Sequence, residues 1–348
     1  MAIEVTLYDT DTLLGVMSQT APVSNYWLDL CFPRQVNFTD EYIDFEKLVK
    51  SRKLAPLVVP TAQGKPIYSE ASTVTRLKPA YVKPKDPVNP NRMIQRRPGE
   101  LLPSSANRGP ASRYNAVVGD IQREHREAIE RRWEWLAAQA IIHGKVTLTD
   151  DAYPERIVDF GRDPGNTVLL SGDLRWGQAD GDIIGNIESW RTKMRRLPFG
   201  GAVDRLTVGS DAWEVMRKDP GLLKQLETDV RGTDGNFRTG IREGLEVEYM
   251  GRISGTLDVY VYSDYYHDKD GTSKDFMSPK DVVLTGPGVS GVRAFGAILD
   301  NTANFQALPI YPKMWSENDP PVVYCMAQSA PLMVPVNPNC TLKATVMS

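Results

Sequence analysis

Residues 112–144 read SRYNAVVGDIQREHREAIERRWEWLAAQAIIHG, and this stretch decides how the rest of the chain must be arranged. It is the longest run without proline in the first half of the sequence, and strong helix formers dominate it. A proline-dense segment precedes it, and Gly144 stands where a left-handed helix stop is expected. The pattern predicts a helix over 112–143, a rod of roughly 45 Å at 1.5 Å per residue.

Charged and apolar side chains both recur at helical spacing in this stretch. The expected ion pairs are Arg123 with Glu127, Glu127 with Arg131, and Arg126 with Glu130. The apolar side chains fall on two faces: Val118, Ile121, Ala128, Trp135 and Ile142 on one, and Ile129, Trp133, Leu136 and Ala140 on the other. A helix with two apolar faces needs two surfaces to pack against. Gly119 leaves two alternatives, a bend in the rod or a helix that begins at Asp120 as its cap.

Composition excludes several classes of protein. The chain has 348 residues and a formal net charge of -3, whereas a dedicated nucleic-acid binder is strongly basic. No apolar run reaches the roughly 18 residues of a membrane span, and the acidic N-terminus does not have the basic and apolar regions of a signal peptide. We therefore expect the protein to stay in the cytoplasm where it is made. Cys31, Cys325 and Cys340 form no CxxC pair, which predicts reduced, buried thiols.

The first 55 residues are typical of an extended arm with short elements. Residues 10–18 predict a short helix. The apolar run NYWLDLCF at 25–32 must be buried against another apolar surface. Acidic side chains dominate up to position 46: Glu4, Asp9, Asp11, Asp29, Asp40, Glu41, Asp44 and Glu46.

Residues 56–110 have the opposite character, because they hold ten of the 25 prolines and many cations. Proline at this density forbids a helix, and STVTRL (72–77) with AYVK (80–83) predicts a long two-stranded excursion. Between positions 76 and 97 seven of its side chains are basic: Arg76, Lys78, Lys83, Lys85, Arg92, Arg96 and Arg97. Three interpretations stay open: a solvated face, a nucleic-acid contact with only Tyr81 interleaved, or a ribbon that meets the acidic arm of another copy.

Beyond residue 144 the chain alternates between strands and short helices. Residues 146–165 predict a strand pair, and 166–310 a layered α/β region with a helix over 182–197 and another capped by Ser210. The final segment, 311–348, is strand-like and broken by prolines. It is too apolar for a free tail, so we expect it to pair with the strands that follow the long helix.

No catalytic or metal-binding motif in the sequence has the spacing and context that its chemistry requires. His125, His143 and His267 have no partner at metal-ligand spacing. Residues 286–291, GPGVSG, formally match GxGxxG, but VRAFGAILD follows where a dinucleotide site needs a helix. We expect a loop there, no cofactor and no metal. An enzyme using Gly286–Gly291 remains the rival class, to be tested with a nucleotide-binding screen.

Several short pieces, in order along the chain, carry a resemblance to a known family. They are PAYVKPK (79–85) with VNP (88–90), GKVTLT (144–149), YPKMW (311–315) and QSAPLM (328–333). With these pieces the sequence resembles the lambda-like major capsid proteins of tailed bacteriophages, the capsid protein E family. The resemblance implies an α+β fold of the HK97 type.

That fold implies a division of the chain into five parts. Residues 1–55 would be the N-terminal arm, 56–110 the extended E-loop hairpin, and 111–165 the peripheral (P) domain with its spine helix at 112–143. An inserted axial (A) domain would span 166–310. Return strands of the P-domain would occupy 311–348, so that one face of the spine helix covers a sheet formed partly by the C-terminus.

The resemblance also implies function and partners. Members of the family form pentamers and hexamers that close into an icosahedral head around double-stranded DNA, with scaffold, portal and often decoration proteins. Such a protein is a component of the virion that assembles in the host cytoplasm, with no membrane contact. The alternative is another self-assembling protein, an encapsulin-like shell or a tail tube. The expected contacts between copies join the basic side chains of 76–97 to Asp40, Glu41, Asp44 and Glu46.

Overall fold

The computed structural model of the chain describes eleven stretches of sequence: residues 7–18, 25–40, 42–48, 72–88, 110–150, 153–198, 200–222, 247–268, 270–303, 306–318 and 321–347. The α-helices in them are α1 (Thr10–Ser18), α2 (Tyr26–Cys31), α4 (Pro110–His143), α5 (Ile183–Arg196) and α6 (Ser210–Met216). The strands are β1 (Arg34–Asn37), β2 (Ile43–Leu48), β3 (Ser72–Leu77), β4 (Lys85–Val88), β5 (Lys145–Asp150), β6 (Tyr153–Asp159), β7 (Thr167–Leu169), β8 (Arg205–Val208), β9 (Val247–Ile253), β10 (Leu257–Tyr262), β11 (Tyr265–His267), β12 (Ser273–Asp275), β13 (Asp281–Thr285), β14 (Val292–Phe295), β15 (Tyr311–Asn318), β16 (Pro321–Gln328), β17 (Pro331–Val334) and β18 (Thr341–Thr345).

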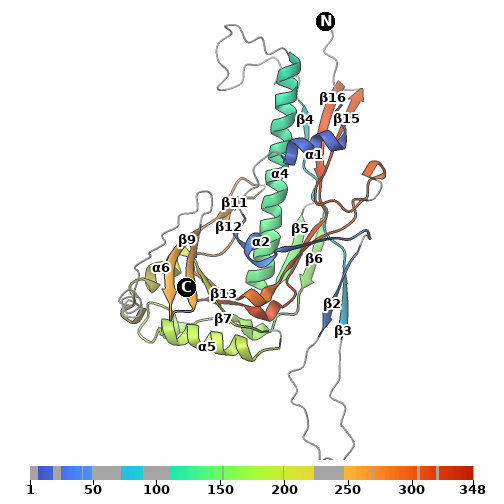
Figure 1. Cartoon of the computed structure of the whole chain (residues 1–348). Helices are drawn as coiled ribbons and strands as arrows, with labels where there is room; N and C mark the ends of the chain where they lie inside the picture. Colours follow the sequence, from blue (N-terminus) through green and yellow to red (C-terminus); the bar gives the residue numbers. More distant parts are fainter. Residues whose placement is uncertain are drawn as a thin grey trace, which may run out of the picture.

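Helix α4 runs along most of the molecule and confirms the long helix expected from the sequence (Figure 1). It begins at Pro110, so Gly119 lies inside it and the alternative start at Asp120 is wrong. The chain leaves the helix at Gly144, whose φ of +69° is the left-handed conformation that glycine adopts freely. The buried Arg162 guanidinium caps this end, donating to the Ile141 carbonyl at 2.9 Å and the Ile142 carbonyl at 3.0 Å.

Only one of the expected ion pairs along α4 forms as predicted. Arg126 Nε lies 2.7 Å from Glu130 Oε1, at i,i+4 spacing. Arg123 instead pairs with Asp120, one turn earlier, at 3.5 Å. The Arg131 guanidinium donates to the backbone carbonyl of Tyr265 at 3.2 Å.

The two halves of α4 are buried differently. The first half buries one stripe that includes Tyr114, Val117, Val118 and Ile121, against Leu13 of α1 and the inner face of β4 and β16. From Trp133 to Ile142 nearly every side chain is buried or half-buried, and this half belongs to the largest core of the molecule. The two halves of α4, and not its two apolar faces, therefore have different partners, and the lower half is enclosed by the fold.

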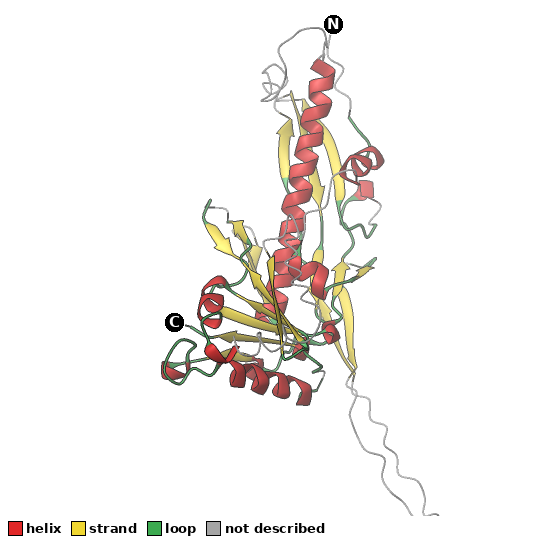
Figure 2. Cartoon of the chain, turned by 60° about the vertical axis from the view of Figure 1, so that its left-hand side comes forward, coloured by secondary structure: helices red, strands yellow, loops and turns green. Residues whose placement is uncertain are grey.

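A six-stranded sheet forms a second layer beside the lower end of α4 (Figures 1 and 2). Its strand order is β7-β18-β13-β8-β10-β9. Helix α5 confirms the helix expected over 182–197, and it begins after the cap Asp182, whose carboxylate accepts the Gly185 N–H at 2.8 Å. The cap of α6 is Gly209, so the prediction that Ser210 caps it is wrong. Both helices bury their apolar faces in a separate core with this sheet.

The C-terminal strands do not pair as the sequence analysis expected. Among the described residues, β5 and β6 pair only with each other, so 146–165 and 311–348 do not share a sheet. The C-terminal strands divide instead among three sheets: β15 and β16 join β4, β17 joins β14, and β18 lies between β7 and β13. Alternating apolar side chains identify a strand but not its partner, because register and neighbour are set by tertiary packing.

The hairpin also differs from the prediction. Strand β3 pairs antiparallel with β2, which begins at Ile43, and not with residues 80–83. Residues 80–83 contribute one isolated bridge, between Val82 and Ser329, and β4 then adds to the edge of β16. Residues 85–88 therefore lie against the long helix, although the sequence placed them in the protruding excursion.

Gly119 inside α4 and Gly144 directly after its end provide a matched test of this geometry. A methyl group at Gly144 would require a left-handed alanine and would stand 2.7 Å from Arg162 Nε, so Gly144→Ala should lower the free energy of unfolding by about 1–2 kcal/mol or more. A methyl group at Gly119 would meet nothing within 4 Å, so Gly119→Ala should raise it by about 0.5–1 kcal/mol. Urea unfolding of both variants measures the two changes, and equal signs would contradict the described helix end.

Candidate functional site

The surfaces expected to contact other copies are the basic segment 76–97 and the acidic arm. Arg76, Lys78, Lys83 and Lys85 are described, whereas Arg92, Arg96 and Arg97 lie outside the described residues, as does Glu41. The Lys78 carbonyl accepts a hydrogen bond from Arg156 at 3.2 Å, which ties the chain after β3 to β6.

Lys85 is engaged by aromatic rings of its own sheet. Its ammonium lies 3.8 Å from the ring centre of Tyr324 and 5.0 Å from that of Trp315, and the two rings stack at 5.6 Å. Lys83 makes a similar contact with Tyr81 at 5.1 Å. A cation over an aromatic face is stabilised by the ring quadrupole. Both lysines thus have contacts within the chain, while remaining exposed on one side.

The acidic partners are only partly brought together with these cations. Asp40 is exposed, and its carbonyl accepts the Ala297 N–H at 3.3 Å. Asp44 and Glu46 lie on β2, and the register of the hairpin sets Asp44 directly opposite Arg76. The Arg76 guanidinium also stands 5.7 Å from the ring centre of Tyr42. One acid and one base expected to meet between copies are therefore neighbours within one hairpin.

The arm itself is fixed to the long helix by a clamp that the sequence analysis missed. Both carboxylate oxygens of the buried Glu134 accept first-turn N–H groups of α2, from Trp27 at 2.7 Å and Leu28 at 2.9 Å. At the other end, the Arg293 guanidinium donates to the Phe32 carbonyl at 2.7 Å and to Asp29 Oδ1 at 2.7 Å. An anion at the N-terminus and a cation at the C-terminus match the helix dipole.

Apolar packing completes the attachment of the arm. Trp27, Leu28 and Phe32 are fully buried, as the run NYWLDLCF predicted. Tyr26 stacks on Tyr262 with ring centres 5.1 Å apart, and its hydroxyl lies 2.8 Å from the Thr207 hydroxyl. The arm is therefore part of the core at α2. The signal for its anchor in the sequence is Glu134, an acid that stands between Trp133 and Trp135.

Glu134 titrates near neutral pH because of its surroundings. Burial raises the pKa of this carboxyl to about 7, although the Trp27 and Leu28 N–H groups lower it, and nearby Asp264 and Asp29 add to the rise. It forms no ion pair with a described cation. The docked arm therefore favours the protonated form more than the unfolded chain does.

The sign of the resulting pH dependence follows from linkage. The unfolded carboxyl titrates near 4.5 and the folded one near 7. Its stabilising contribution is complete below about pH 4.5 and is lost as the pH rises to about 7, a change of at most about 3 kcal/mol. In urea unfolding between pH 4.5 and 8, Glu134→Gln should remove this decrease of the free energy of unfolding with rising pH. The exposed Glu124→Gln on the same helix should retain it, and identical slopes for the two variants would contradict the assignment.

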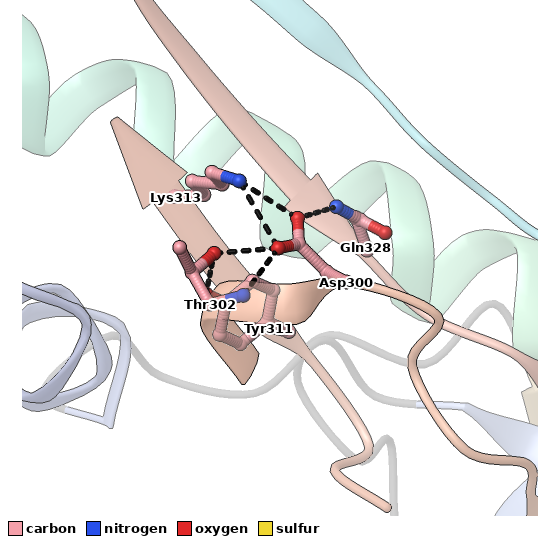
Figure 3. A network of polar contacts seen from close by, with 5 residues as sticks. All are labelled: Asp300, Thr302, Tyr311, Lys313 and Gln328. Atoms are coloured by element: carbon pink, nitrogen blue, oxygen red, sulfur yellow. Dashed lines mark hydrogen bonds and ion pairs between the residues drawn. The ribbon is translucent and has the colours of Figure 1, made fainter. Parts of the chain in front are cut away.

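Two further polar contacts join separate segments of the chain: one lies between α4 and β4, and the other joins the turn at 300–302 to β15 and β16. His125, expected to have a surface or packing role, is buried, and its Nε2 lies 2.8 Å from Asp86 Oδ2 on β4. Asp300 accepts from Lys313 at 2.8 Å, from Thr302 N–H at 2.9 Å and from Gln328 at 3.3 Å (Figure 3). Burial would raise the pKa of Asp300, but the hydrogen bonds from Lys313 and Thr302 outweigh it and lower that pKa to about 2.

The glycine-rich segment 286–291 has a packing role in this fold. A 3-10 turn at Pro287–Val289 and then β14 follow Gly286, with no helix. A methyl group at Gly286 would stand 1.9 Å from the Ala202 carbonyl oxygen, and one at Gly291 would stand 2.4 Å from the Phe32 ring. These glycines permit close packing, which explains the match to GxGxxG without a pyrophosphate.

Neither a metal cluster nor a spanning helix is found in the part of the chain that the structure describes. No group of three or more His, Cys, Asp or Glu side chains there could hold a metal ion. None of the helices described is long and apolar enough to cross a membrane.

Comparison with known proteins assigns the chain to a family. The model of the family described as phage major capsid protein E matches residues 9–346. The chain belongs to that family. The major capsid protein of Escherichia phage lambda is 29% identical over 343 residues, with 96% of this chain and 98% of the relative covered. That of Enterobacteria phage P21 is 29% identical over 338 residues, covering 96% and 97%.

Solved structures agree with this assignment at the level of the fold. A putative capsid protein of a prophage of E. coli CFT073 superposes with a TM-score of 0.75 at 23% identity, covering 98% of this chain and 100% of that one. The mature capsid of bacteriophage PhiM1 gives a TM-score of 0.51 at 11% identity, covering 99% and 92%. The fold is therefore that of the HK97-type phage capsids, as the resemblance implied. The protein is a structural, shell-forming capsid protein of the virion and not an enzyme.

Proposed function

We propose that this protein forms pentamers and hexamers that close into the icosahedral head of a tailed phage around packaged double-stranded DNA. The observation that carries the proposal is the family match over nearly the whole chain, 9–346. Scaffold and portal proteins, and in some heads a decoration protein, would assist assembly in the host cytoplasm. The formal net charge of -3 favours a shell that encloses DNA without binding it specifically.

The strand pairing supports a revised division of the chain. The axial domain would comprise the six-stranded sheet with α5 and α6, and β18 would belong to it although it lies within 311–348. The peripheral domain would comprise α4 with the sheets β15-β16-β4 and β1-β14-β17. The E-loop would have β2 and β3 as its base, so it would begin near Ile43 and not at residue 56.

The basic ribbon of 76–97 would meet acidic surface on a neighbouring copy. The opposed charge of 1–46 and 76–97 supports this contact, although Asp44 and Arg76 face each other within one chain. Each exposed ion pair contributes only about 0–1 kcal/mol, so the effect would come from repetition over every interface of the shell.

Electron microscopy of the expressed protein, with its scaffold where one is needed, tests the proposal. Closed polyhedral particles are expected. Tubes would support the tail-tube alternative, and free monomers would contradict both. Small particles packed with a foreign protein would support the encapsulin-like alternative.

Reversing Arg92, Arg96 and Arg97 to glutamate tests the basic ribbon separately. The triple variant should fold as a monomer, with wild-type circular dichroism, and should give few or no particles. The exposed Arg217→Glu, at the C-cap of α6, provides a charge-reversal control that should assemble normally. Normal shells from the triple variant would refute the role of the ribbon.

A further inference from the structure

Helix α5 lies along the lower edge of the molecule and turns one face to solvent (Figures 1 and 2). Its buried face, which includes Ile187, Trp190 and Met194, packs on the six-stranded sheet. An open groove of about 550 Å³ follows the outer face over the last turns. Its lining residues are Glu188, Ser189, Thr192, Lys193, Arg196 and Leu197.

The groove is cationic, and Leu197 is the one apolar residue among those that line it. Its one acid, Glu188, is paired with Arg191 at 2.9 Å, so the free charges in the groove are those of Lys193 and Arg196. The Lys193 ammonium donates to the Gly165 carbonyl, which fixes its position. Arg196 is exposed and forms no ion pair among the described residues. Cations at a helix C-terminus also complement the dipole, but they leave this groove able to bind an anionic partner.

The segment that leads into α5 has the opposite chemistry. Leu169 and Leu174 are 73% and 57% exposed, so this segment presents apolar side chains to solvent. Asp173 and Asp180 are exposed beside them, and the Asp180 N–H donates to the Asp173 carbonyl at 3.2 Å, so one turn carries both carboxylates. The one cation of the segment, Arg175, is half-buried and donates from Nε to the Leu170 carbonyl at 3.3 Å. We name residues 169–180 the acidic loop.

The acidic loop is held in place before any partner arrives. Trp176 is buried beneath it and stacks on Trp190 with ring centres 6.2 Å apart and planes at 20°. The Trp176 N–H also donates to the Val346 carbonyl at 3.0 Å. Trp190 belongs to the buried face of α5, and none of the residues that line the groove belongs to the acidic loop of the same chain.

We propose that the acidic loop of one copy seats in the α5 groove of the next copy, with Leu174 against Leu197 and the carboxylates of Asp173 and Asp180 facing Lys193 and Arg196. Complementary patches at different places on one chain make a heterologous contact, and a repeated heterologous contact closes into a ring when the rotation allows it. A second copy is the partner favoured here because both halves of the complementary pair are on the same chain. The inference rests on the proposed function, since it assigns a contact within the ring-shaped capsomers.

Reciprocal charge reversal tests the contact. Arg196→Asp and Asp173→Arg should each reduce the fraction of protein in particles several-fold in sedimentation, while circular dichroism stays unchanged because both side chains are exposed. The double variant should restore particles, and Arg217→Glu should match the wild type. Wild-type yields from both single variants would overturn the proposal.

Cross-linking the wild-type protein with a carbodiimide gives an independent measurement. The carbodiimide adds to a carboxylate of Asp173 or Asp180 and forms an O-acylisourea. The Lys193 amine then attacks the acyl carbon, an amide bond forms, and the reagent leaves as its urea. Mass spectrometry of digested particles should find this link, and digested monomers should not contain it. Particles without the link would contradict the inference alone, whereas a wild-type protein that forms no particles would contradict the proposed function.

Discussion

The burial of the lower half of α4 is the constraint on which the rest of the structure depends. Between Trp133 and Ile142 the helix is enclosed, so the arm, the C-terminal strands and the strands beside β13 must all converge there. A helix buried on most sides cannot be satisfied by one sheet. Segments more than a hundred residues apart in sequence therefore meet at one place, and the first half of α4 extends from it to support β4 and β16.

The ends of this buried region are closed by polar groups that each satisfy several partners. Arg162 caps the last turn of α4, and Glu134 caps the first turn of α2. Each group is buried, so each is costly unless its hydrogen bonds are made. The same two groups thus fix where the helix stops and where the arm attaches, which gives the extended elements a rigid base.

The sequence predicted local features well and long-range pairing poorly. The helix over 112–143, the α5 helix and the burial of NYWLDLCF were predictable because periodicity, caps and apolar density are properties of neighbouring residues. The partner of β3 and the place of β18 were predicted wrongly, because any strand with alternating apolar residues fits several sheet edges. The resemblance to capsid proteins gave the family and the function, but it did not reveal the role of Glu134 or the strand register that sets Asp44 opposite Arg76.

Native-state hydrogen exchange along α4 tests the central claim most directly. Amides between residues 133 and 142 should exchange only through global unfolding, with the largest protection in the chain. Amides between 113 and 124, which bury a single stripe, should exchange earlier through local opening. Equal protection along the helix, or earlier exchange in its lower half, would contradict the view that the fold is built around that buried half.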